Sequence, residues 1–162
     1  MQMTRLIKTL AALGLATAAA SSFAGRPLIV DDAGINAKGQ GHVETWLTEA
    51  DGVNAFSISP AYAFWDSVEL AAVFSRFNQG GLTVTGAQAK WMITPASDKG
   101  CNFATSFGAQ RLKDDFDSAN VSFINGLFSC NGNAFGNVHF NVGYAKASGF
   151  SGETSYGVAL EK

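Results

Sequence analysis

Short segments in which apolar and polar residues alternate follow one another from residue 41 to the end of the chain. A period of two is the pattern of a β-strand with one apolar face, and no segment after residue 24 keeps the period of a helix. Runs rich in Gly, Asp, Asn and Ser, which are turn residues, separate the segments. The pattern therefore predicts an all-β antiparallel meander of about eight strands, of the kind that forms a transmembrane β-barrel.

The predicted strands have about the length that a tilted strand needs to cross a bilayer, which is roughly 9 to 11 residues. They are residues 42–50, 54–65, 67–77, 82–94, 101–112, 118–130, 134–147 and 152–162. All the connections between them are short, so neighbours in sequence are expected to pair with each other.

In most of these strands one face is apolar and the other carries small or polar residues. Phe56 and Ile58 share one side of their strand, while Ser57 and Ser59 share the other. A soluble barrel turns the apolar face inward, whereas a membrane barrel turns it toward lipid. Aromatic residues favour the membrane, because they gather near both ends of the strands, as interfacial belts do. The residues expected in the two belts are Phe64, Trp65, Trp91, Phe103 and Phe128 at one end and Phe56, Phe74, Phe77 and Phe150 at the other.

The first residues indicate export from the cytoplasm. Arg5 and Lys8 precede the apolar run 9–20, and Ser22 and Ala24 offer small residues at the positions that signal peptidase inspects. We therefore predict a cleaved signal peptide over residues 1–24, an irregular lead-in over 25–40 and a barrel domain over 41–162. The predicted location is the outer membrane of a Gram-negative bacterium.

The two cysteines predict one specific contact. Pairing Cys101 with Cys130 centres the hairpin between Asp115 and Phe116, in the acidic turn that composition places there. In an oxidising compartment a disulfide between them is expected. The same register leaves strand 118–130 apolar on both faces, which predicts either a bulge or a partly apolar interior at this strand.

Composition and motifs point away from several function classes. The formal net charge is −2 at pH 7 and there is no basic run, so nothing indicates nucleic-acid binding. His42 and His139 stand alone without the spacing of metal ligands, and the glycines mark turns. We predict neither an enzyme nor a cofactor or metal site.

The polar face holds the remaining candidates for a site. Its residues could form an ion-pair network that fills a narrow barrel, or they could line a path for a solute. The candidates for the lumen and for contact with a solute are Glu44, Glu69, Gln88, Lys90, His139, Asn141 and Glu161.

Four runs carry a resemblance to a known family. They are RPLIVDDA at residues 26–33, GQGHVE at 39–44, HFNVGY at 139–144 and YGVALE at 156–161. Together they resemble the outer-membrane family named for the meta-pathway of phenol degradation. The resemblance implies a transporter-like barrel for small hydrophobic or aromatic solutes, with about four strands beyond the last run. Because this sequence stops at Lys162, either it is truncated or its barrel closes early.

The leading hypothesis is an outer-membrane β-barrel for passive transport of small hydrophobic or aromatic solutes, with lipid of that membrane as its surroundings. A structural barrel with a filled interior is the second hypothesis. A soluble periplasmic β-barrel that binds lipid is the third.

Overall fold

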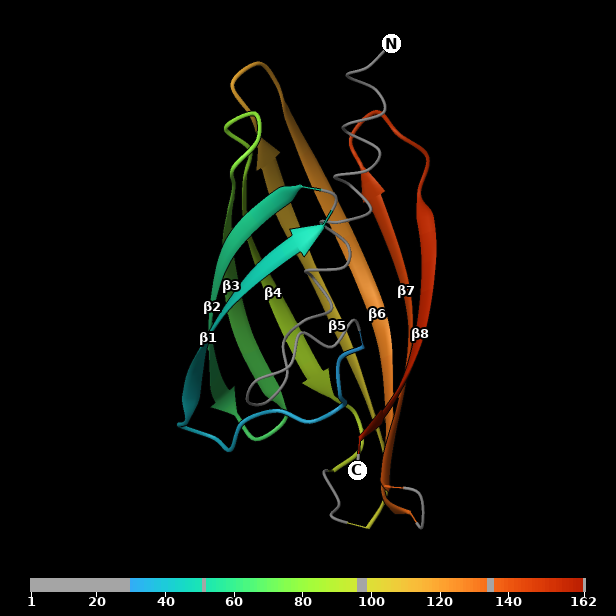
Figure 1. Cartoon of the computed structure of the whole chain (residues 1–162). Coiled ribbons are helices and arrows are strands. Elements are labelled where there is room, and N and C mark those ends of the chain that lie inside the picture. Colours follow the sequence, from blue (N-terminus) through green and yellow to red (C-terminus); the bar gives the residue numbers. More distant parts are fainter. Residues whose placement is uncertain (1–29, 51, 96–98, 134–135, 162) are drawn as a thin grey trace.

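The computed structural model describes residues 30–50, 52–95, 99–133 and 136–161, so the predicted signal peptide and the first part of the lead-in lie outside the described residues. Eight antiparallel strands form one sheet in sequence order (Figure 1). They are β1 (Gly41–Ala50), β2 (Val53–Trp65), β3 (Val68–Phe77), β4 (Thr83–Met92), β5 (Gly100–Lys113), β6 (Ser118–Asn133), β7 (Gly136–Ala147) and β8 (Glu153–Glu161). Every predicted strand is confirmed, with bounds that differ by at most three residues.

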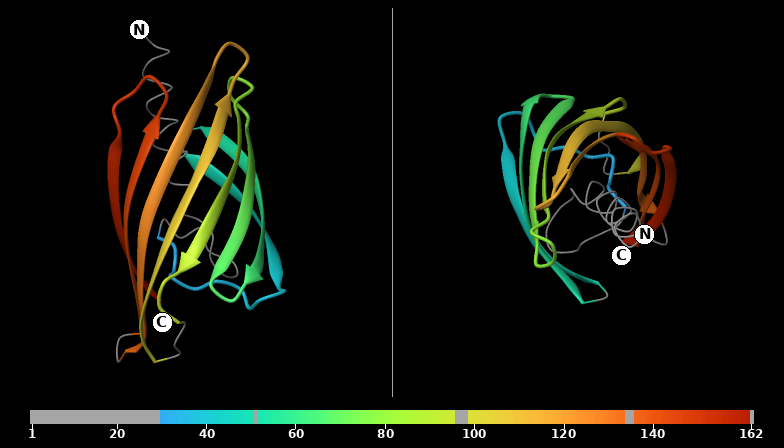
Figure 2. Two further views of the ribbon diagram at one scale, coloured as in Figure 1. Left: turned by 180° about the vertical axis from the view of Figure 1, so that it is seen from behind. Right: turned by 90° about the horizontal axis from the view of Figure 1, so that it is seen from above.

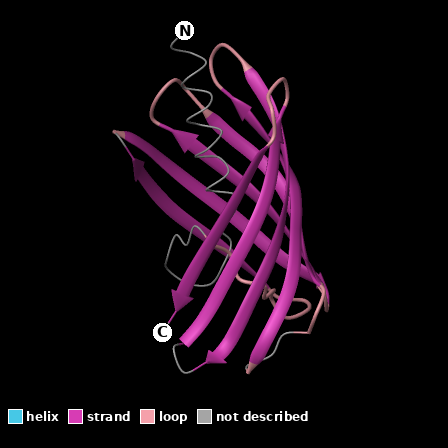
Figure 3. Ribbon diagram, turned by 90° about the vertical axis from the view of Figure 1, so that its right-hand side faces the viewer, coloured by secondary structure: helices cyan, strands magenta, loops and turns pink. Residues whose placement is uncertain are grey.

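The sheet curls into a half-barrel, as the view along its axis in Figure 2 shows. Figure 3 shows long tilted strands joined by short loops, without a helix in the described part of the chain. We call the end that holds Gly41 and Glu161 the base, and the opposite end, with the turn at 114–117, the far end. Within the described residues no ladder joins β1 to β8, so these two strands are the open edges of the sheet.

The strands are staggered, so a line drawn across the sheet along paired residues climbs from the base to the far end. It starts at His42, the second residue of β1, and arrives at Glu153, the first residue of β8. Between these ends it passes through Ala61, Ala71, Gln88, Gly108, Phe123 and Ala145. Such a stagger is what the tilt of strands in a barrel requires.

The two faces of the sheet differ in polarity as the alternation predicts. The concave face is rich in small and polar side chains, and Ser57, Ser75, Ser106 and Ser129 on it are at most 2% exposed. The convex face carries exposed apolar side chains, of which Leu47 is 80% exposed. This polarity is the reverse of that of a soluble barrel.

The concave face changes character along the strands. At the far end it is lined by an apolar cluster that consists of Ala55, Phe77, Leu82, Val84, Leu112, Val121, Phe123 and Ala145. Of the two alternatives predicted for β6, the partly apolar interior is found, since Val121 and Phe123 belong to this cluster. The β6–β7 register also shifts between Cys130 and Asn133, at the base end of β6. The expectation for Phe77 was wrong: it is 4% exposed and belongs to this inner cluster, because its position in β3 has the parity of the concave face.

The predicted disulfide is confirmed. Cys101 and Cys130 are bonded directly across the β5–β6 hairpin, with an S–S distance of 2.07 Å. The pair Lys113 and Ser118 closes the same ladder at the far end, so the turn falls where the cysteines place it.

Candidate functional site: a polar cluster at the base

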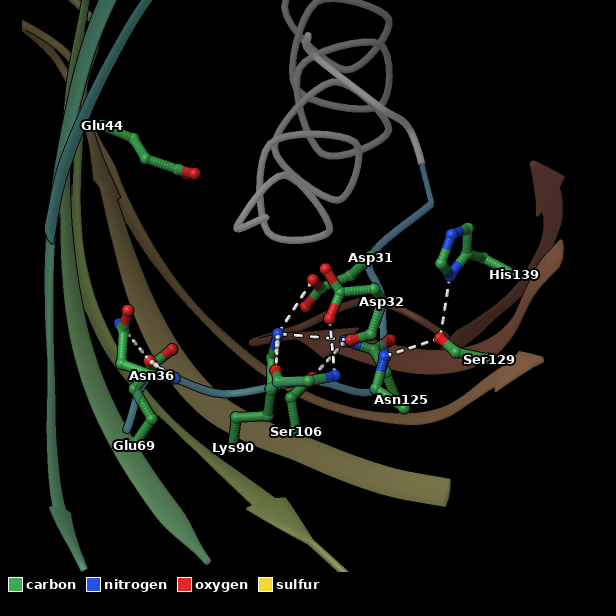
Figure 4. A network of polar contacts seen from close by, with 12 residues as sticks. Asp31, Asp32, Asn36, Glu44, Glu69, Lys90, Ser106, Asn125, Ser129 and His139 are labelled. Atoms are coloured by element: carbon green, nitrogen blue, oxygen red, sulfur yellow. Dashed lines mark hydrogen bonds and ion pairs between the residues drawn. The ribbon is translucent and has the colours of Figure 1, made fainter. Parts of the chain in front are cut away.

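Residues 30–36, which we call the inner segment, lie across the concave face near the base (Figure 4). The segment has no regular structure, and it is buried or half-buried throughout, whereas residues 37–40 are exposed. Its apolar anchor is Ala33, which is fully buried against Ala104 and Leu127. Val30, which is also buried, lies beside Gly157 of β8. The polar contacts of the segment involve four strands, β1, β3, β4 and β6.

Lys90 of β4 makes the central contact with the inner segment. Its Nζ atom donates to Asp31 Oδ1 at 2.9 Å, to the carbonyl of Asp32 at 3.3 Å and to the carbonyl of Gly34 at 3.2 Å. The side chains of Lys90 and Asp31 are only 3% and 2% exposed. A buried ammonium requires such partners, since burial of an unpaired charge is very unfavourable.

Glu69 of β3 holds the other end of the segment. Its Oε2 atom accepts from the backbone amide of Asn36 at 3.0 Å and from the side-chain Nδ2 of the same residue at 2.5 Å. Asn36 Nδ2 also lies 2.6 Å from His42 Nδ1. The carboxylate of Glu69, which is 3% exposed, is thereby satisfied by hydrogen bonds that cross from strand to segment.

Ser129 of β6 supports the middle of the segment. Its Oγ atom accepts from the amide of Ala33 at 2.8 Å and lies 2.8 Å from His139 Nδ1 on β7, and His139 Nε2 is 3.6 Å from Glu161 Oε2. These residue types also occur in hydrolase triads. Here Ser129 is 2% exposed and its Oγ is bonded to a backbone amide, which favours a supporting role.

Burial changes the acidity of Asp31. Removal from water raises the pKa of its carboxyl group from 3.8 to about 8, although the nearby Lys90 acts in the opposite direction. Asp32 and Glu69 add to the increase, because their negative charges disfavour a third one. The pKa of Asp31 therefore stays above its ordinary value when the inner segment is in place, even with Lys90 beside it.

We expect the inner segment to be held less firmly as the pH rises from about 4 to about 8. The pKa of Asp31 is higher in the docked state than in the undocked one, so its contribution is complete below 3.8 and is lost as the pH passes the docked value. Hydrogen exchange at the amides of Ala33 and Asn36, corrected for the intrinsic rate, measures this. Protection that increases with pH over this interval would contradict the expectation.

The structure brings three of the predicted residues together and places the others apart. Glu69, Lys90 and His139 are buried around the inner segment. Gln88 and Glu44 are half-buried on the same face, and Asn141 is 8% exposed with an Oδ1 atom that has no hydrogen-bond partner among the described residues. The expectation for Glu161 holds only in part: it faces the concave side, but its side chain is 56% exposed because β8 is an edge strand.

Sequence reasoning missed the residues that meet these side chains. Asp31, Asp32 and Asn36 lie in a segment without periodicity, and Ser129 is one of many serines. The adjacent acids 31 and 32 were the available signal, because a lone lysine on a polar strand face needs a carboxylate partner. Their contact with Lys90 spans 59 residues of sequence, which no local pattern indicates.

The described residues contain no helix that is long and apolar enough to cross a membrane. They also contain no group of three or more His, Cys, Asp or Glu side chains placed to hold a metal ion. No curated protein and no solved structure matches the chain. A family model matches residues 9–162, and the chain belongs to the family described as Uncharacterised conserved protein UCP029691.

Proposed function

We propose that this chain is an integral β-barrel protein of the bacterial outer membrane, whose interior offers small apolar solutes a passive path. The exposed apolar convex face carries the proposal. One row of paired residues across four strands consists of Phe103, Phe128, Phe140 and Val158, which are 40%, 40%, 43% and 64% exposed. Contiguous apolar surface of this extent is unfavourable in water and favourable in lipid.

The inner wall supports the second half of the proposal. The apolar cluster at the far end is compatible with an apolar solute, which agrees with the solute class that the sequence resemblance implies. The polar base, by contrast, is closed by the inner segment and its contacts with Lys90, Glu69 and Ser129. A path through the protein therefore requires that the inner segment move.

A structural barrel with a filled interior is the second candidate function. It is favoured by the near-complete burial of the polar cluster, since side chains and the inner segment together fill the base. In that case the buried network would stabilise the protein and no solute would pass.

Two adjacent alanines provide a matched test of the membrane location. Ala72 is exposed on the convex face, whereas Ala71 is 8% exposed on the concave face. With both native cysteines in the disulfide, Ala72→Cys and Ala71→Cys each offer one free thiol for a small fluorophore. We expect brominated lipid to quench the label at position 72 strongly and to leave position 71 unlabelled or unquenched.

Recovery of the chain in the soluble fraction, with no quenching at either position, would refute the membrane location. Strong quenching at 71 but not at 72 would reverse the two faces. Flux of small apolar solutes into liposomes that contain the protein then separates the two candidate functions. Flux above that of empty liposomes supports a path, and its absence at every pH between 4 and 8 supports the structural barrel.

A further inference from the structure

We propose that β1 and β8 pair with each other in the membrane, in the antiparallel register that sets His42 opposite Glu161, and so close an eight-stranded barrel. This inference rests in part on the proposed membrane location. In hydrocarbon an open sheet edge leaves amide and carbonyl groups without partners, each at a cost of several kcal/mol, so membrane sheets close. Here both edges are long, because β1 has 10 residues and β8 has 9.

The directions of the two edges are compatible. The chain runs from the base to the far end in β1 and returns to the base in β8, so the two strands are antiparallel when they meet. A pairing between them would continue the pattern of every other ladder in the sheet.

The stagger of the sheet is compatible with this register. The line of paired residues that starts at His42, at the base of β1, ends at Glu153, at the far end of β8. From Glu153, β8 runs for eight more residues to Glu161 at the base. If β1 and β8 pair with their base ends aligned, His42 faces Glu161 and not Glu153. The strand register is then displaced by eight residues in one turn around the barrel. For eight strands, a displacement of about eight residues gives a strand tilt of about 35°, which lies at the lower limit of the usual range for barrels.

This register also matches the side chains. On the convex face it sets Val43 opposite Leu160 and Leu47 opposite Tyr156, and on the concave face it sets Trp46 opposite Gly157. Inside, Trp46 would thus lie beside Gly157 and Val30 of the inner segment, and outside apolar residues meet. A shift by one residue would place the apolar side chains of one strand beside the polar face of the other.

The side chains on the concave face favour a barrel closed by one chain over a larger barrel closed by two copies of the chain. An eight-stranded barrel has an interior just wide enough for side chains, whereas sixteen strands leave an aqueous channel. On β2 to β7 most concave side chains are buried, and the far end of this face is apolar. Around a wide aqueous channel, Phe77, Val84 and Phe123 would face water.

Disulfide formation between paired cysteines tests the register. In the full chain, expressed with its own leader in a Gram-negative host, we expect Thr45→Cys with Val158→Cys to link within one chain upon oxidation. Leu47→Cys with Tyr156→Cys should give the same result. The mismatched pair Thr45→Cys with Thr154→Cys is the control, and it should link at least about tenfold less, because a disulfide needs Cβ atoms roughly 3.5 to 4.5 Å apart.

Linked peptides are identified by mass spectrometry of a non-reduced digest, and the gel separates monomer from dimer. Linked dimers from the in-register pairs would overturn closure within one chain in favour of two copies. A membrane-inserted, heat-modifiable protein that forms no link would overturn the closure alone. A soluble protein that forms the engineered disulfide within one chain would support the closure and refute the membrane location. A soluble protein that does not form this disulfide would refute both.

Discussion

Replacing Lys90 by Met is expected to destabilise the folded protein by about 3 to 5 kcal/mol, the usual effect of removing one partner of a buried ion pair. The substitution keeps the length of the side chain but leaves Asp31, the carbonyl of Asp32 and the carbonyl of Gly34 without their donor. Urea unfolding in detergent micelles, followed by tryptophan fluorescence and by heat-modifiable migration on a gel, measures the free energy.

Lys38→Met is the matched control. Lys38 also forms an ion pair, with Asp66 at 3.4 Å, but the two side chains are 57% and 84% exposed. Exposed pairs contribute about 0 to 1 kcal/mol, so this variant should unfold almost as the wild type does. Equal and small losses for both lysines would show that the buried cluster does not stabilise the fold.

Removing the disulfide should cost about 3 to 4 kcal/mol in the chain-entropy model, because the bond closes a loop of roughly 30 residues in the unfolded chain. The variant that carries both Cys101→Ser and Cys130→Ser keeps the β5–β6 ladder, so the loss arises mainly in the unfolded state. Urea midpoints with and without reductant measure it.

The wild type treated with reductant should unfold like the double serine variant, and reductant should leave that variant unchanged. If the oxidised wild type and the double variant have the same midpoint, the entropic contribution is absent. A midpoint of the double variant that shifts with reductant would show an effect unrelated to this bond.

The strands could be predicted because two local signals coincide in this sequence. Alternation identifies the faces, and turn residues such as those around Asp115 identify the ends. The disulfide could be predicted from the position of the turn, because the two cysteines lie at equal distances in sequence on either side of it. Both signals act over a few residues or across one hairpin, where chain geometry leaves few alternatives.

The polar cluster could not be predicted in the same way. Its contacts join the inner segment to strands 33, 59 and 96 residues away, and their partners depend on how far the sheet curls. Glu161 shows the same limit at the level of a single residue, whereas the parity of Phe77 with Ser75 already assigns Phe77 to the concave face. The parity of a residue decides its face, but whether that face is covered depends on the position of the strand in the sheet.

The polar contacts of the inner segment with β3, β4 and β6 have a consequence for the shape of the protein. Glu69, Lys90 and Ser129 belong to β3, β4 and β6, and each is bound to the same short stretch of backbone. The segment thus connects β3, β4 and β6 across the concave face and restrains the curvature of the sheet. Because the segment precedes β1 in sequence while Ser129 lies in β6, the tie is complete only once β6 has joined the sheet. It then limits how far the sheet can flatten between β3 and β6.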